Sequence, residues 1–183
     1  MNPRPLVLTL LVLAASGLLA GETKMFPEAS APRIFSEWRD SSDGKISVCF
    51  TTNKTTFGAK ETIVVHCAVK NTSDKPLTVL RPFGDEFYAY AAGIMILGPD
   101  GSIPYRGAMK DYVLGTSSFL VLPAHSVMDE SLDLPAGIFP GLGQAGLYTI
   151  GYQFVSGSDP RQPAPENLWQ GQIKTAPLTI LVQ

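Results

Sequence analysis

Two histidines, His66 and His125, are the only imidazole side chains in this chain of 183 residues. Imidazole is the side chain that most often serves as a general base or a metal ligand near neutral pH. His66 alternates with Val65 and Cys67 within an apolar run, so in an extended strand it points away from their face. His125 lies in the turn-forming segment 122–126, and neither histidine begins a zinc-ligand spacing. We therefore expect both histidines to be structural, and we predict no metal site and no cofactor.

Serine and carboxylate side chains also lack the spacing of a catalytic centre. Ser117 and Ser118 follow Gly115, but the second glycine of a Gly-x-Ser-x-Gly nucleophile elbow is missing. Asp129 and Asp133 share one parity of a predicted strand, which an edge strand with an outward acidic face explains. We therefore expect that the protein is not an enzyme.

The first 20 residues predict a cleavable export signal. Arg4 precedes the apolar run 6–13, and small residues follow at 14–17. The apolar stretch is shorter than the roughly 20 residues that a membrane-spanning helix needs; an uncleaved membrane anchor is the alternative. We expect a signal peptide at 1–20 and a mature protein that is secreted or periplasmic, with no transmembrane segment.

An exported chain meets oxidising conditions, which makes its two cysteines candidates for a disulfide. Cys49 and Cys67 fall in adjacent predicted strands, almost symmetrically about Gly58, so a hairpin would set them opposite each other. We predict a Cys49–Cys67 disulfide, which in the chain-entropy description contributes roughly 3 kcal/mol. Two buried thiols are the alternative.

Two N-glycosylation sequons lie in predicted turns, at Asn53-Lys54-Thr55 and Asn71-Thr72-Ser73. They matter only in a chain of eukaryotic source. Under that condition we expect Asn53 and Asn71 to be the modified residues.

Composition favours an all-β protein. The 17 glycines and 15 prolines are spread through the chain and break it into short segments rich in threonine and valine.

The formal net charge is only −2, with both signs interspersed, so the basic surface that nucleic-acid binding requires is missing. About 160 mature residues are enough for one domain with its own core.

We predict an extended lead-in at 21–44 and a domain at 45–183. Within the lead-in, Ile34, Phe35 and Trp38 could dock on the domain as a short helical turn or an edge segment. The domain is predicted to be an immunoglobulin-like sandwich of two antiparallel sheets with seven to nine strands. Strand signals lie at 46–51, 62–70, 77–80, 88–97, 103–105, 119–122, 127–134, 146–154, 169–174 and 178–182.

The clearest strand is 146–154, because one set of alternating residues forms an unbroken apolar face: Tyr148, Ile150, Tyr152 and Phe154. Its Gly-x-Tyr beginning is typical of the tyrosine corner of immunoglobulin-like sandwiches. We therefore predict that the Tyr148 hydroxyl bonds to the backbone upstream, near Leu142 or Gly143.

Two loops are the candidate contact surfaces for a partner protein, and arginine and aromatic side chains are the usual anchors of such surfaces. One is the segment 81–88, Arg-Pro-Phe-Gly-Asp-Glu-Phe-Tyr, and the other is the proline-rich loop 156–169. The predicted partner-binding residues are Arg81, Phe83, Asp85, Glu86, Tyr88 and Trp169. The alternative for 81–88 is structural, with Phe83 and Phe87 closing the end of the sandwich and Arg81 paired to Asp85 or Glu86.

Four short motifs carry a resemblance: Val-Lys-Asn-Thr-Ser-Asp-Lys-Pro-Leu-Thr-Val-Leu at 69–80, Gly-Pro-Asp-Gly at 98–101, Leu-Val-Leu-Pro-Ala-His-Ser-Val at 120–127 and Gly-Leu-Tyr-Thr-Ile at 146–150. Their order resembles the non-catalytic immunoglobulin-like domain of secreted deuterolysin and peptidyl-Lys metalloendopeptidase chains. It is also similar to small bacterial proteinase-inhibitor β-sandwich domains. The chain departs from the metallopeptidases because it lacks His-Glu-x-x-His and has Ala124 where that turn usually has glycine. The resemblance therefore implies a sandwich without a catalytic domain, and it transfers no catalytic residue.

We expect an exported, non-enzymatic module that binds another protein. The resemblance favours a secreted peptidase as that partner, with this chain as an inhibitor or as an orphan prodomain-like module. One alternative is a structural or envelope-associated spacer or assembly module. Another is a carbohydrate-binding module, for which exposed Trp38, Tyr105 or Trp169 would form the stacking face.

Overall fold

The computed structural model describes residues 34–83, 93–107, 114–160 and 163–183. These residues confirm the predicted all-β fold as a sandwich of packed sheets. The elements are β1 (Ile34–Phe35), β2 (Arg39–Asp40), β3 (Ile46–Thr52), β4 (Thr56–Phe57), β5 (Ile63–Asn71), β6 (Leu77–Leu80), β7 (Ile94–Gly98), β8 (Gly101–Ile103), the 3-10 turn η2 (Thr116–Ser118), β9 (Phe119–Leu122), β10 (Val127–Leu134), β11 (Gly146–Ser156), β12 (Gly171–Lys174) and β13 (Leu178–Val182). Within these residues, no helix has the length and apolar character that crossing a bilayer requires.

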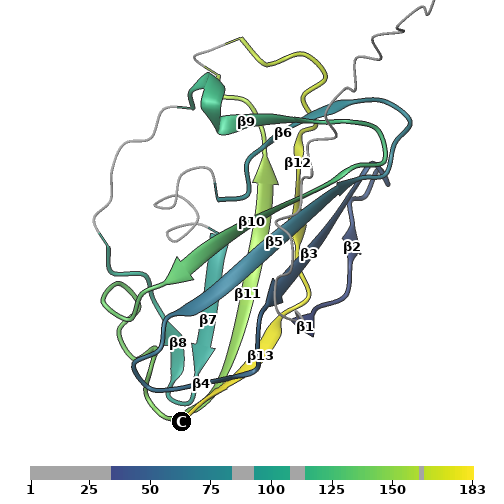
Figure 1. Cartoon of the computed structure of the whole chain (residues 1–183). Coiled ribbons are helices and arrows are strands. Elements are labelled where there is room, and N and C mark those ends of the chain that lie inside the picture. The colour runs from purple at the N-terminus through teal and green to yellow at the C-terminus, as the bar shows by residue number, and fades with distance from the viewer. Residues whose placement is uncertain (1–33, 84–92, 108–113, 161–162) are drawn as a thin grey trace, which may run out of the picture.

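The sandwich has two main layers (Figure 1). The first sheet has the antiparallel order β1-β3-β5-β10, and β2 also pairs with β3. The second has the order β4-β13-β11-β7-β8, with β12 paired to the C-terminal half of β11. A separate two-stranded ribbon, β6-β9, lies at the end of the sandwich opposite the C-terminus.

The core lies between the two layers and follows the period of two that extended strands impose. On β11, Tyr148, Ile150, Tyr152 and Phe154 are all buried, as their alternation predicts. From the facing sheet, the Phe50 ring stacks on Tyr152 with 5.8 Å between ring centroids.

The predicted tyrosine corner is present. The Tyr148 hydroxyl lies 2.7 Å from the carbonyl oxygens of Gly141 and Gln144, which flank the predicted positions Leu142 and Gly143. The corner ties the loop before β11 to the start of that strand, and burial raises the pKa of Tyr148. The narrower assignment of the sandwich to the immunoglobulin-like class stays a prediction.

Part of the predicted lead-in belongs to the sandwich. β1 and β2 form one edge of the first sheet, with Phe35 opposite Thr51 and Arg39 opposite Val48. The short strands β1, β2 and β4 carry no strong period-two signal and lie outside the predicted strands. The predicted signal peptide 1–20 and lead-in residues 21–33 lie outside the described residues, as do positions 88–92 of the predicted strand 88–97.

The predicted Cys49–Cys67 disulfide is wrong, because both residues are buried free thiols. The strands β3 and β5 pair as expected, but Cys49 lies opposite Ala68 and Cys67 lies opposite Phe50. Successive side chains of a strand point to opposite faces, so this register places the two sulfurs on opposite sides of the sheet. Cys67 faces the core, whereas the Cys49 thiol donates to the Ser36 carbonyl oxygen at 3.1 Å.

Candidate functional site

The ribbon β6-β9 forms the floor of a groove at one end of the sandwich. In its register Thr78 lies opposite Val121, and Val79 lies opposite Leu120. Val79 is buried in the core, so the other row of the ribbon, with Thr78 and Val121, faces outward. Val121 keeps 59% of its surface exposed.

The proline-rich loop forms the wall of this groove because β6 binds its backbone. Thr78 donates its N–H to the Asn167 carbonyl oxygen at 2.9 Å and its hydroxyl to the Glu166 carbonyl oxygen at 2.7 Å. The Trp169 N–H donates to the Thr78 carbonyl oxygen at 2.8 Å. Asn167 has a positive φ of 53°, a conformation that asparagine tolerates better than most residues. The loop thus joins β6 at the edge opposite β9.

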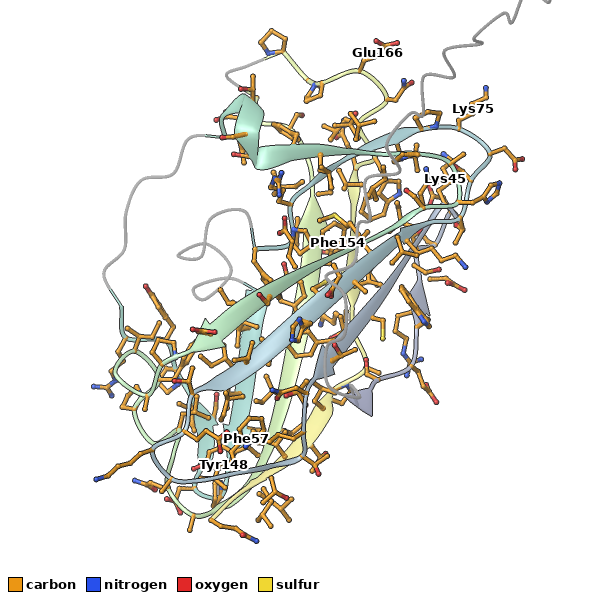
Figure 2. All side chains as sticks on the ribbon, in the orientation of Figure 1. Lys45, Phe57, Lys75, Tyr148, Phe154 and Glu166 are labelled. Atoms are coloured by element: carbon orange, nitrogen blue, oxygen red, sulfur yellow. The ribbon has the colours of Figure 1, made fainter. Side chains whose placement is uncertain are left out.

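The groove between ribbon and loop has a volume of about 490 Å³. Its lining is mainly apolar, and among the described lining residues Glu166 alone is charged; Figure 2 shows Glu166 on the loop at the outer end of the molecule. The remaining lining residues are Pro76, Thr78, Gly115, Thr116, Phe119, Leu120, Val121, Pro163, Pro165 and Asn167. This surface suits an apolar side chain, with a cationic group beside it at Glu166.

A second hollow, of about 630 Å³, lies on the other side of the same loop. It shares Pro76 and Asn167 with the first groove, but charges of both signs line it, among them Asp43, Lys45 and Lys75. Figure 2 shows Lys45 and Lys75 at this end of the sandwich. The segment 167–168 is therefore a ridge between an apolar groove and a charged hollow.

Asp43 fixes the base of this ridge. Its carboxylate accepts hydrogen bonds from the Ser41 hydroxyl at 2.6 Å, from the Lys45 N–H at 3.2 Å and from the Trp169 indole N–H at 3.3 Å. Mainly because of the Ser41 bond, the pKa of Asp43 falls to about 2.

Trp169 is not an exposed contact residue, contrary to its predicted role. Only 6% of its surface is accessible, and its ring stacks on Phe154 with centroids 6.0 Å apart and an interplanar angle of 8°. Trp169 holds the ridge to the core and adds only a small accessible surface to the charged hollow.

Arg81 and Phe83 also have structural contacts. Arg81 Nη1 donates to Glu130 Oε1 at 2.6 Å, and the Phe83 N–H donates to Glu130 Oε2 at 3.2 Å. The Phe83 ring is 6% exposed and packs 5.1 Å from the ring centroid of Tyr152, whose hydroxyl bonds to the Pro82 carbonyl oxygen. Phe83 is therefore part of the core, as the structural alternative implied, but its partners lie in the middle of β10 and β11 and not at the end of the sandwich. Asp85, Glu86 and Tyr88 lie outside the described residues.

The two histidines lie apart from the groove, and each has a carboxylate neighbour. His66 Nδ1 is 3.7 Å from Asp129 on the outward face of the first sheet, and His125 Nε2 is 3.0 Å from Asp74 in an exposed turn. In the part of the chain that the structure describes, no three His, Cys, Asp or Glu residues gather closely enough to hold a metal ion. The absence of enzymatic activity stays a prediction.

The two sequons differ in accessibility. Asn53 is exposed, so its modification stays a prediction. Asn71 is 0% exposed, and its amide nitrogen lies within 2.8–3.1 Å of three carbonyl oxygens, those of Lys75, Leu122 and Pro123. The predicted modification of Asn71 is wrong for the folded protein, because a glycan there would break this buried network.

Of the three aromatic residues expected to bind sugar, only Trp38 is largely exposed, at 43%. Tyr105 is partly buried and packs edge-on against Phe139 at 5.9 Å, and Trp169 lies in the core. These residues do not form a stacking face.

A scan against protein-family models and a search of curated proteins find no match to this chain. The candidate site is therefore defined by its geometry alone. Sequence reasoning identified the loop 156–169 but missed β9, which forms part of the floor of the groove. The available signal was Val121, an apolar residue at an outward position of a short strand.

Proposed function

We propose that the protein is an exported, non-enzymatic β-sandwich that binds another protein at the groove between β9 and the loop 163–167. The observation that carries this proposal is the exposed apolar lining of the groove, with Val121 at its floor. Exposed apolar surface is retained where a partner covers it.

The edge of β9 supports a specific way of binding. Among the described strands β9 pairs with β6 alone, so its other edge is where we propose that an extended segment binds. Such a segment would add a strand to the ribbon, and alternate side chains would enter the groove. A segment with an apolar residue followed by lysine or arginine fits the lining and Glu166.

A secreted peptidase is the partner class that we favour. This part of the proposal rests on the resemblance of the turn motifs at 69–80 and 120–127 to domains of secreted peptidase chains and proteinase inhibitors. If the bound segment lies beside the catalytic cleft of the peptidase, binding at the groove would lower the activity of that peptidase. This inhibition needs no chemical step on this chain.

The test is inhibition of purified peptidases secreted by the same source, measured with mature wild-type protein and with Val121→Asp. Val121→Thr is the matched control, because it keeps the β-branched shape without adding charge. We expect Val121→Asp to raise the inhibition constant at least tenfold, whereas Val121→Thr changes it by less than about threefold, since removing one apolar contact is a small effect. Equal inhibition by wild type and Val121→Asp would exclude this groove, and the absence of binding to every such peptidase would exclude the partner class.

A further inference from the structure

The outward face of the second sheet carries exposed apolar side chains far from the groove. Met95 is 50% exposed, Leu97 54% and Leu147 63%. The register brings them together, because Gly151 pairs with Met95, Thr149 with Leu97 and Leu147 with Leu181. Three of the most exposed large apolar side chains of the described residues thus lie on one sheet face, two on β7 and one on β11.

This face carries no charge over its central strands. The outward positions of β7, β8, β11 and β13 are Met95, Leu97, Ser102, Leu147, Thr149, Gly151, Gln153, Val155, Thr179 and Leu181. A charge on this sheet face lies at its periphery, where Lys174 of β12 is opposite Gln153. By contrast, the outward face of the first sheet has Lys70, Asp129 and Asp133. An uncharged apolar face needs no complementary charges in its partner, and homodimer interfaces are more apolar than other interfaces.

The same face has both a projection and a hollow. Gly151 has no side chain, and a Cβ atom built there would meet only the Met95 methyl group, at 3.6 Å. A depression of about 670 Å³ lies here, with Met95, Gly151 and Pro177 in its lining. Leu147 projects from the same strand four residues earlier, a separation of about 13 Å at about 3.3 Å per residue.

We propose that this face is a two-fold interface between copies of this chain, in which Leu147 of one copy enters the hollow above Gly151 of the other. The rotation axis lies in the interface plane, runs perpendicular to β11 and crosses it at Thr149. This rotation makes the β11 strands of the two copies antiparallel and places Leu147 of one copy over Gly151 of the other. One rotation then forms both contacts, as a self-complementary interface requires. The same axis brings Leu97 against its own copy, because Leu97 lies beside Thr149.

The size of the face predicts a weak dimer. The 11 residues of β11 extend about 36 Å, whereas β7 and β13 extend about 17 Å each and β8 about 10 Å. With strands spaced about 4.8 Å apart, the footprint is roughly 380 Å² per copy, about half of the roughly 800 Å² per partner of a stable specific interface. We therefore expect a transient dimer with a dissociation constant in the range of about 100 μM to 1 mM.

The test is sedimentation velocity of the mature protein over concentrations from about 1 μM to about 1 mM, which cover this range of affinity. We expect a monomer–dimer equilibrium in the wild type and a monomer for Leu147→Glu. Trp38→Glu is the control, because it places the same charge at an exposed apolar position off this face, and it should dimerise like the wild type. A wild type that stays monomeric throughout, or a Leu147→Glu variant that dimerises normally, would overturn the proposal.

Two further variants test the geometry. Gly151→Val fills the hollow without adding charge, so it should weaken dimerisation while leaving the melting temperature unchanged or higher. Thr149 lies on the proposed axis, so in Thr149→Cys the two introduced thiols face each other and mild oxidation should link two copies. The native cysteines are buried and should not crosslink. Dimerisation of Gly151→Val at wild-type strength, or a wild-type dimer in which Thr149→Cys does not crosslink, would contradict the arrangement. These readouts need no peptidase and are independent of the proposed function.

Discussion

The indole N–H of Trp169 donates to the carboxylate of Asp43, 3.3 Å away and 126 residues earlier in the chain. This bond joins the turn between β2 and β3 to the ridge that separates the apolar groove from the charged hollow. The position of the candidate site therefore depends on a contact between distant segments of the chain.

Asp43→Asn should destabilise the protein in a pH-dependent manner. The folded-state pKa of Asp43 is lowered to about 2 from an ordinary value of 3.8. The carboxylate therefore contributes stability that is fully present above about pH 4 and is lost as the pH falls through about 2. The difference in unfolding free energy between wild type and Asp43→Asn should be constant near neutral pH and disappear towards pH 2. Urea titrations followed by tryptophan fluorescence measure it, and a pH-independent difference would contradict the assignment.

Glu130→Ala should destabilise the protein more than Arg81→Ala. Glu130 accepts from both the Arg81 guanidinium and the Phe83 backbone N–H, so its loss leaves a largely buried donor without its acceptor. Such a group costs about 1–3 kcal/mol. The Arg81 side chain is 40% exposed, so its replacement should cost less than about 1 kcal/mol. Denaturant unfolding of the two variants and of Glu130→Gln checks the order, and a larger effect for Arg81→Ala would show that the ion pair matters more than the backbone bond.

Both thiols should stay unreactive until the protein unfolds. Burial raises the pKa of Cys49 and of Cys67, and in both cases this lowers the fraction of reactive thiolate. We expect a thiol-specific chromogenic reagent to label neither residue in the native state and both in denaturant, and a reducing agent to leave the melting temperature unchanged. A melting temperature that falls on reduction would indicate that the bond forms in a different strand register.

Asn71→Ala should be among the more destabilising single substitutions. The Asn71 amide bridges the turn after β5 to the turn after β9, and its side-chain oxygen accepts from the Ser73 N–H at 2.9 Å. Losing these bonds leaves buried carbonyl oxygens unpaired, at a cost of about 1–3 kcal/mol. Asn53→Ala is the matched control, since Asn53 is exposed and should change stability by less than about 0.5 kcal/mol. Similar thermal shifts for the two variants would argue against the buried network.

Local patterns in the sequence were sufficient to predict most strands and the tyrosine corner. The alternation from Tyr148 to Phe154 determines which face of β11 is buried, because a strand repeats every two residues. The corner lies at 141–148, so its hydrogen bond depends on residues that are neighbours in the chain. Short edge strands such as β1 and β4 carry too few residues to show a period.

Contacts between distant segments were decided only by the tertiary structure. Whether Cys49 faces Cys67 depends on a single-residue choice of register, which both strand patterns permit. The partner of Arg81 on β10 and the burial of Trp169 against Phe154 depend on how the layers pack. The sequence by itself therefore determined the strands and their buried faces, because these follow from local alternation. The groove, the fate of the cysteines and the outward apolar face required the packing of strands far apart in the chain.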